Sequence, residues 1–86
     1  MKTIFKYSFR IAGRFSLDMK DEAKILTAFM QNDVPCLWAE VDTDMRRIKV
    51  RDFAIIGTGN PMPKEESSWI ATFPDGSFIW HLYELK

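Results

Sequence analysis

Fold class depends on one segment, Ala23-Lys-Ile-Leu-Thr-Ala-Phe-Met-Gln-Asn-Asp-Val-Pro-Cys-Leu-Trp-Ala-Glu-Val-Asp42. Two apolar arms flank a polar centre, Gln31-Asn32-Asp33. Four apolar residues of the first arm have the i, i+1, i+4, i+5 spacing of an amphipathic helix: Ile25, Leu26, Phe29 and Met30. A helix near Asp21–Gln31 would make the domain α+β, whereas a strand over Lys24–Gln31 would make it mainly β.

The second arm favours the strand. Val34–Val41 is an apolar run of strand length that begins beside a proline, which is typical of a buried strand. A short polar turn then joins it to the first arm as a hairpin. Trp38 is predicted to be a core residue of this arm; if it were exposed, the interaction surface of the domain would belong here.

The N-terminal part of the chain shows the alternation of period two that strands have. Aromatic residues alternate with polar ones along Lys2–Ile11, and the alternation resumes along Phe15–Lys20 after a break at Gly13. These two runs predict a hairpin in which Gly13 takes a positive φ at the turn.

The C-terminal part adds further strands. Ile48 and Val50 alternate in one phase and Phe53 and Ile55 in the other, which predicts a bulge near Arg51-Asp52. A strong turn signal at residues 74–76 predicts a terminal hairpin. The sequence therefore predicts a single domain, residues 1–86, that is mainly β: a small antiparallel sandwich or partly open barrel of about six or seven strands. The α+β fold stays the alternative.

The composition argues against several classes of function. Twelve basic and twelve acidic side chains cancel, so the net charge provides no long-range attraction for nucleic acid or an anionic membrane. A single cysteine cannot form an internal disulfide, and no signal-peptide pattern opens the chain, so a cytoplasmic protein is expected. No apolar run reaches the ~18–20 residues of a transmembrane helix, so no membrane partner is expected.

No catalytic or metal site is predicted. Zinc needs about four Cys, His or carboxylate ligands at characteristic spacing, and the chain has only Cys36 and His81. These two could act as nucleophile and base if their strands were neighbours, but a small buried thiol is the favoured interpretation. Gly57-Thr-Gly59 lacks the third glycine and the lysine of phosphate-binding loops. We therefore expect no enzyme, no cofactor and no metal.

A basic cluster, a loop and the last strand are candidate binding sites. In a strand the basic residues of the cluster, Arg47, Lys49 and Arg51, would point the same way and form a positive stripe of about 13 Å. Such residues also occur at solvated strand edges. The last strand is apolar in both phases, which indicates either a central strand covered on both sides, self-association or a hydrophobic partner surface. The candidate binding residues are Arg47, Lys49, Arg51, Asn60, Met62, Trp80 and His81.

Five motifs carry a resemblance: Met1-Lys-Thr-Ile-Phe-Lys-Tyr7, Ala23-Lys-Ile-Leu26, Pro35-Cys-Leu-Trp-Ala39, Gly57-Thr-Gly59 with Pro61, and Phe73-Pro-Asp-Gly76 with Trp80-His81. Through them nearly the whole chain resembles an uncharacterised family of small proteins from tailed bacteriophages and prophages. The resemblance implies a strand at Lys24–Gln31 and no established activity. The chain departs from the family at Asn60, where histidine is common, and at Lys20-Asp-Glu22, where a Pro-Lys-Gly turn is usual.

These features together predict a non-catalytic module that binds a host or phage protein, a nucleoprotein complex included, in the host cytosol. Small phage proteins of this kind often block host enzymes or defence complexes, so the resemblance implies an inhibitor of the anti-defence type. The alternative is a small β module that binds nucleic acid through the basic stripe, with Tyr7 or Trp69 stacking on bases. Self-association through the C-terminal strand is a further expectation.

Overall fold

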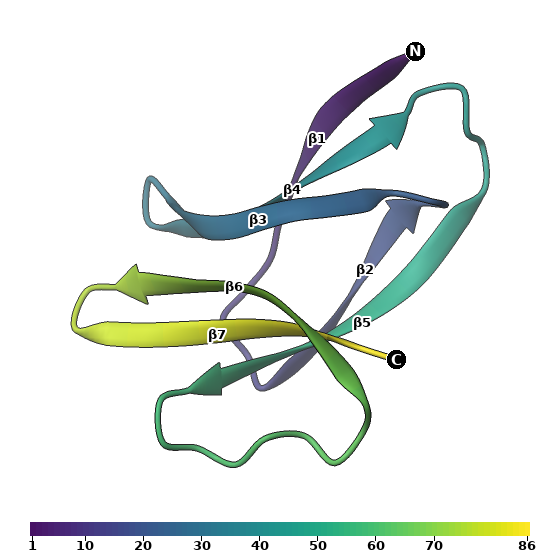
Figure 1. Ribbon diagram of the computed structural model, residues 1–86. Coiled ribbons are helices and arrows are strands. Elements are labelled where there is room, and N and C mark those ends of the chain that lie inside the picture. Colours follow the sequence, from purple (N-terminus) through teal and green to yellow (C-terminus); the bar gives the residue numbers. More distant parts are fainter.

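The computed structural model describes residues Met1–Lys86 and consists of seven strands joined by turns and loops (Figure 1). The strands are β1 (Lys2–Ser8), β2 (Arg14–Lys20), β3 (Lys24–Gln31), β4 (Val34–Asp42), β5 (Ile48–Gly57), β6 (Ser67–Asp75) and β7 (Phe78–Leu85). They form two antiparallel sheets, of order β1-β4-β3 and β2-β5-β7-β6. The mainly β prediction is therefore confirmed, and the α+β alternative is wrong. No helix is long and apolar enough to cross a membrane.

The segment 23–42 forms the β3–β4 hairpin. Asn32 and Asp33 are its two turn residues, with φ of 50° and 65°, as a type I′ turn requires. The ladder register shifts between Ile25 and Thr27, so Leu26 is an extra residue in β3. This bulge explains the helix-like spacing of the first arm, because it changes the phase of the strand and separates its inward-facing residues by three positions instead of two.

The terminal hairpin is also confirmed. Asp75 pairs with Phe78, and Gly76, the first residue of the two-residue turn, has a φ of 58°. β6 carries a second bulge, because its register with β7 shifts between Trp69 and Ala71.

The predicted hairpin of the first two strands is wrong. β1 pairs with β4, and β2 pairs with β5 in the other sheet, so residues 9–13 cross between the sheets. Phe9 still donates its backbone N–H to the Pro35 carbonyl at 3.0 Å, and Gly13 accepts from the Ile55 N–H at 3.1 Å. The crossing needs no tight turn, and Gly13 accordingly has no positive φ.

The predicted bulge near Arg51-Asp52 is also wrong. β5 keeps one register with β2 from Ile48 to Ala54. Ile48 and Val50 face outward from the sheet and are each 59% exposed, whereas Phe53 is fully buried between the sheets. The two apolar phases of the sequence therefore belong to the two faces of one regular strand.

The core lies between the two sheets and is formed by alternate residues of every strand. Phe15 links the crossover to the centre, because its ring stacks on Phe9 at 4.7 Å and on Phe53 at 5.1 Å between centroids. Only 16 of the 86 residues are buried, in keeping with a domain whose thinnest dimension is 16 Å. The largest fully buried side chains are Phe53, Phe73, Met19, Leu37, Leu82 and Cys36.

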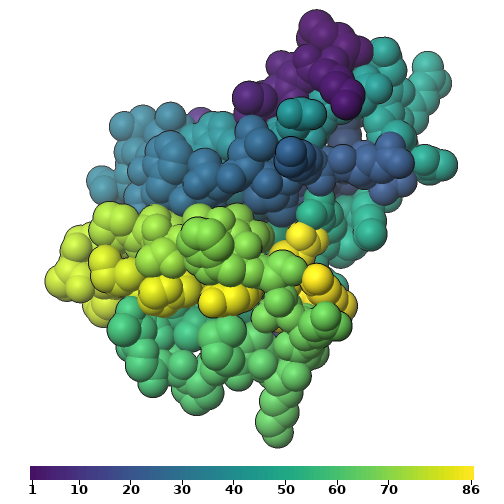
Figure 2. All heavy atoms as spheres, viewed as in Figure 1, coloured from purple at the N-terminus to yellow at the C-terminus, as the bar shows by residue number.

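The barrel is closed on one side and open on the other. β3 lies alongside β6 of the other sheet, without a hydrogen-bonded ladder, and Figure 2 shows their atoms in contact along their length. β1 and β2 are the edge strands at the other side, and no strand pairs with their free edges. The domain is therefore a partly open barrel that has two unpaired edges.

Candidate interaction surface

The predicted basic stripe is only partly free in the structure. Arg47 lies just before β5, and its Nε is 3.3 Å from a carboxylate oxygen of Asp21. Lys49 is exposed. Arg51 points toward the inner side of the sheet, where Glu84 binds it. Two of the three cations thus have an acidic partner, which weakens the stripe as a site for phosphates.

Arg51 is the most strongly held of these residues. Its Nε and Nη2 donate to the two carboxylate oxygens of Glu84 at 2.6 and 2.7 Å, and its Nη1 donates to the Ala23 carbonyl at 2.5 Å. The bonds to Glu84 raise the pKa of Arg51 above its ordinary value, although partial burial opposes this effect. The side chain therefore joins β5, β7 and the start of β3 and contributes to structure.

Met62 and Asn60 lie in the long connection between β5 and β6. Met62 is 51% exposed beside a shallow hollow lined by Pro61 and Pro63. Asn60 folds back toward the end of β5: a Cβ built on Gly57 would lie 2.9 Å from Asn60 Nδ2 and 3.4 Å from the Trp80 ring. The structure thus brings Asn60 and Trp80 together, whereas Met62 lies apart from them.

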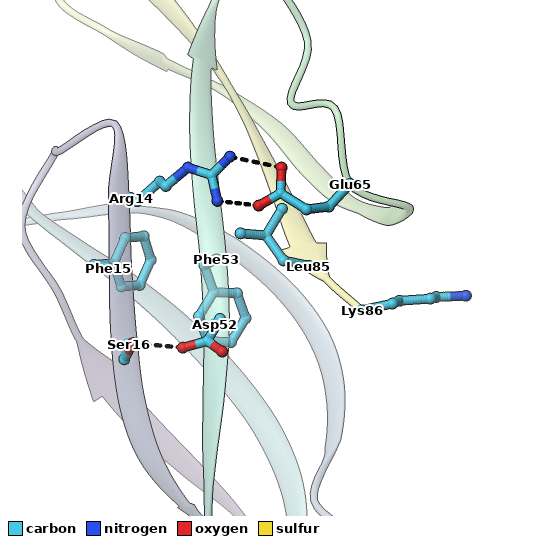
Figure 3. A pocket seen from close by; sticks show the side chains of 8 residues that line it. All are labelled: Arg14, Phe15, Ser16, Asp52, Phe53, Glu65, Leu85 and Lys86. Carbon is cyan, nitrogen blue, oxygen red and sulfur yellow. Dashed lines mark hydrogen bonds and ion pairs between the residues drawn. The ribbon is translucent and has the colours of Figure 1, made fainter.

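The same connection is tied to β2 by an ion pair (Figure 3). Both terminal nitrogens of Arg14 donate to the two carboxylate oxygens of Glu65, and one of these bonds measures 2.7 Å. Bonding to Arg14 lowers the pKa of Glu65 to about 2. The adjoining hollow has a volume of about 360 Å³, but Ser16 also donates to Asp52 there at 2.6 Å. Since these polar groups satisfy one another, the hollow does not suggest a ligand.

The two predicted residues of β7 lie on opposite faces of their sheet. Trp80 is half-buried on the inner side, and its Nε1 donates to Asp75 at 3.1 Å. His81 faces outward between two threonines: Thr58 Oγ1 is 2.9 Å from its Nε2, and Thr72 Oγ1 is 3.0 Å from its Nδ1. Both ring systems are held by neighbouring side chains of the domain.

Cys36 and His81 do not meet. Cys36 lies on β4 in the three-stranded sheet and His81 on β7 in the four-stranded sheet, so the condition for a nucleophile and base is not fulfilled. Cys36 is buried, as predicted for a small apolar thiol. No group of three or more His, Cys, Asp or Glu residues is arranged to hold a metal ion.

Trp38 is not a core residue, in contrast to the prediction. The core phase of β4 is Leu37, Ala39 and Val41, and Trp38 points to the opposite, outer face of the three-stranded sheet, where it is half-buried. Its ring stacks on Phe29 of β3 with centroids 4.2 Å apart and an angle of 20°. The prediction that Trp38 is a core residue is therefore wrong. Its position on the outer face directs attention to an interaction surface on this arm of the hairpin.

We call this surface the Trp38 face. Alternation and register place on it Ile4 of β1, Phe29 of β3 and Val34 and Trp38 of β4, with Leu26 of the β3 bulge exposed beside them. Ile4 is 57% exposed, and Leu26, Phe29 and Val34 are each 44% exposed. Apolar side chains thus extend across all three strands of a solvent-facing sheet, which marks an interaction site more often than isolated exposed residues do.

Charged residues surround the Trp38 face unevenly. Three lysines, Lys2, Lys6 and Lys24, point to the same side as Trp38, and two acidic residues, Glu40 and Asp42, lie among them, with Lys2 Nζ 4.0 Å from the Glu40 carboxylate. Lys6 donates to Gln31 at 2.8 Å across the end of the face. At that end Asp33 and Arg10 contribute one charge of each sign. The face therefore carries a local positive excess, although the whole chain is neutral.

Most of this face was missed by sequence reasoning, which assigned both phases of the second arm to the core. The signal was present, since alternate positions of Val34–Glu40 are occupied by Val, Cys, Trp and Glu while the others are Pro, Leu and Ala. A charged residue in the same phase as Trp38 indicates the outward face.

The comparisons with known proteins identify a family but no activity. No curated protein and no solved structure matches the chain. A family model described as Domain of unknown function (DUF7352) matches residues 1–86. With its whole length matched, the chain belongs to the DUF7352 family.

Proposed function

We propose that this domain is a non-catalytic protein-interaction module and that the Trp38 face is its binding surface. The observation that carries the proposal is the Phe29–Trp38 stack on the outside of the three-stranded sheet. Large aromatic side chains lose solvent at little cost in conformational entropy, and they dominate the binding energy of protein interfaces. A sheet face with an aromatic centre and a charged margin has the composition of such an interface.

The charges favour a protein partner over nucleic acid. Two of the three cations of the basic stripe are already bound to Asp21 and Glu84. On the Trp38 face, the ring of Phe29 covers one side of the Trp38 ring, so that side is closed to a nucleic-acid base. A module that binds nucleic acid is retained as the second candidate, because Lys2, Lys6 and Lys24 could contact phosphates beside these rings.

The resemblance to small phage proteins extends the proposal to the partner. The partner is then a host or phage protein in the host cytosol, a subunit of a nucleoprotein complex included, and the domain acts as an inhibitor of a host enzyme or defence complex. Self-association through β7 belongs to the same proposal, since Ile79 on the outer face of that strand is 43% exposed.

The experiment compares two matched valine variants. Val34→Asp changes the Trp38 face, whereas Val50→Asp changes an equally apolar and more exposed position on the other sheet. We expect affinity capture from bacterial cytosol to yield one protein with wild type and Val50→Asp, and calorimetric titration of that purified protein to show binding lost only in Val34→Asp. Equal binding of both variants would overturn the proposed surface. Salt-sensitive binding of single-stranded oligonucleotides, with no protein captured, would favour the second candidate.

A further inference from the structure

We infer that the free edge of β1 receives an extended strand of the partner, in which two acidic residues flank an apolar residue at alternate positions. The inference rests on the proposed function and specifies how the partner binds. Strand addition at a sheet edge is a general mode of peptide recognition, in which backbone bonds provide affinity and alternate side chains provide specificity. Three features of β1 carry the inference.

The first feature is the direction of its backbone groups. Phe9 donates to Pro35 and Thr43 donates to Met1, and both pairs fit the register of β1 with β4. In an antiparallel ladder every second pair exchanges hydrogen bonds, so the odd-numbered residues of β1 are bonded to β4. The N–H and C=O groups of the even-numbered residues therefore point away from β4, to an edge that no strand covers. These residues are Lys2, Ile4, Lys6 and Ser8.

The second feature is an incomplete core behind this edge. Phe5 and Tyr7 point inward from β1 and pack on the core, yet both are only partly buried, with ring centroids 6.3 Å apart. They are the inward residues next to the opening of the barrel. An added strand would cover them, so the partner gains apolar contact as well as backbone hydrogen bonds.

The third feature is the side-chain pattern along the edge. Lys2 and Lys6 flank Ile4 on one face, and Ile4 is 57% exposed. A strand laid beside them places alternate side chains next to these three, and acidic residues opposite the lysines with an apolar residue opposite Ile4 are the complementary choice. The lysines disfavour a second copy of β1, since edge lysines discourage edge-to-edge pairing.

The other open edge fits less well. Outward residues of β2 carry charges of both signs, and three of the four have a partner within the domain: Arg14 bonds to Glu65, Ser16 to Asp52 and Lys20 to the Met45 carbonyl. Both edge strands have an unbroken register, no proline and no bulge over seven residues, so the backbone does not distinguish them. On β1, however, exposed Ile4 lies between two lysines, and a single acidic–apolar–acidic strand complements this pattern. The side-chain pattern therefore points to β1.

The test uses a cyclised hairpin peptide that displays Thr-Glu-Thr-Val-Thr-Glu-Thr on its outer strand, with a second peptide carrying Lys in place of Glu. Cyclisation removes the entropic cost of ordering the strand, so the peptide should bind to an unoccupied β1 edge at millimolar concentration. We expect the acidic peptide to protect the amides of Lys2, Ile4, Lys6 and Ser8 from hydrogen exchange, and to leave the already bonded Thr3, Phe5 and Tyr7 unchanged. The basic peptide should bind at least about tenfold more weakly, a ratio that corresponds to about 1.4 kcal/mol.

A pair of proline variants provides the matched control. Ile4 and Ile48 are exposed to 57% and 59%, and in the register of each ladder the N–H of each points away from its partner strand. Ile4→Pro removes a donor from the β1 edge and should weaken the acidic peptide about tenfold or more, whereas Ile48→Pro should leave its binding unchanged. Retention of the fold is checked for both variants by circular dichroism, and Lys6→Glu provides a second variant if Ile4→Pro unfolds.

The outcomes separate this inference from the proposed function. No binding of the acidic peptide, equal binding of both peptides, or exchange protection elsewhere than at the β1 edge overturns the strand-addition inference. The proposed function depends on the valine pair, since Val34 lies on β4 away from that edge. Suppose that a captured protein fails to bind Val34→Asp but still binds Ile4→Pro and Lys6→Glu. This result would support the Trp38 face as the binding surface and would overturn the inference about the β1 edge.

Discussion

Arg51 on β5 donates two hydrogen bonds to Glu84 on β7, at 2.6 and 2.7 Å, and this pair is the most buried ion pair in the domain. The side chains are 17% and 23% exposed. Arg51 also bonds to the Ala23 carbonyl, so one residue joins the central strands of the four-stranded sheet to the beginning of the β3–β4 hairpin. Contacts of this kind compensate for a core that includes few residues.

Removal of the Glu84 carboxylate should therefore destabilise the domain. We expect Glu84→Gln to lower the free energy of unfolding by about 1.5–3 kcal/mol, because it leaves the Arg51 guanidinium half-buried without its charged acceptor. Urea denaturation followed by fluorescence measures the change. Lys49→Gln, at an exposed position on the same strand, is the control and should change stability by less than about 0.5 kcal/mol. Equal effects of the two substitutions would contradict a structural role for the pair.

Two glycine substitutions distinguish a true turn from a crossover. Gly76 has a φ of 58°, so Gly76→Ala should destabilise the terminal hairpin by about 1 kcal/mol or more. Gly13 has no positive φ and no atom within 4 Å of a built Cβ. Gly13→Ala should be neutral or stabilise by up to about 1 kcal/mol, because alanine restricts the unfolded chain. Thermal denaturation measures both changes in stability. A large loss of stability with Gly13→Ala would contradict a crossover that needs no tight turn at Gly13.

Glu65 should titrate at unusually low pH. Its pKa is lowered from 4.5 to about 2 by Arg14, so the stability that this pair contributes is present above about pH 4.5 and is lost as the pH falls through about 2. The side-chain carboxyl chemical shift measured by NMR should have its midpoint near 2. In Arg14→Gln the midpoint should return toward the ordinary value, and a wild-type midpoint near 4.5 would show that the connection is not held by this contact.

A leucine pair tests the assignment of inner and outer faces on the β3–β4 hairpin. Leu37 is fully buried and Leu26 is 44% exposed. We expect Leu37→Ala to cost about 2–5 kcal/mol, since it leaves a cavity between the sheets. Leu26→Ala should cost no more than about 0.5 kcal/mol. Denaturation midpoints of the two variants compare them directly, and similar losses would mean that the outer face also belongs to the core.

Sequence reasoning succeeded where structure is local and failed where it is not. The turns at Asn32-Asp33 and Gly76-Ser77 were predictable, because the conformations that they need are encoded in these and adjacent residues. The partner of β1 was not, since nothing near Gly13 specifies whether the chain reverses within a sheet or crosses to another. Alternation also cannot distinguish a bulge from a change of face, which is why Ile48 and Val50 were misread.

The candidate site was harder to predict than the fold. Apolar residues on an outer face look like core residues in a sequence, so Trp38 was assigned inward although Glu40 shares its phase. The Arg51–Glu84 and His81–Thr58 bonds join residues that are 33 and 23 positions apart, and no local pattern reveals them. Four residues chosen for charge or aromaticity thus proved to be held by neighbours within the domain: Arg47, Arg51, Trp80 and His81. The Trp38 face consists instead of aliphatic and aromatic residues of β1, β3 and β4.

The contact between β3 and β6 has a consequence for the order of folding. Each of these strands belongs to a hairpin whose turn is two residues long, and the three remaining ladders join strands far apart in the sequence. Short loops close first because they lose less entropy. The two hairpins should therefore form early and dock through β3 and β6, and β1 and β2 should add last. Substitutions in the hairpins would then slow refolding, whereas those in β1 would mainly accelerate unfolding.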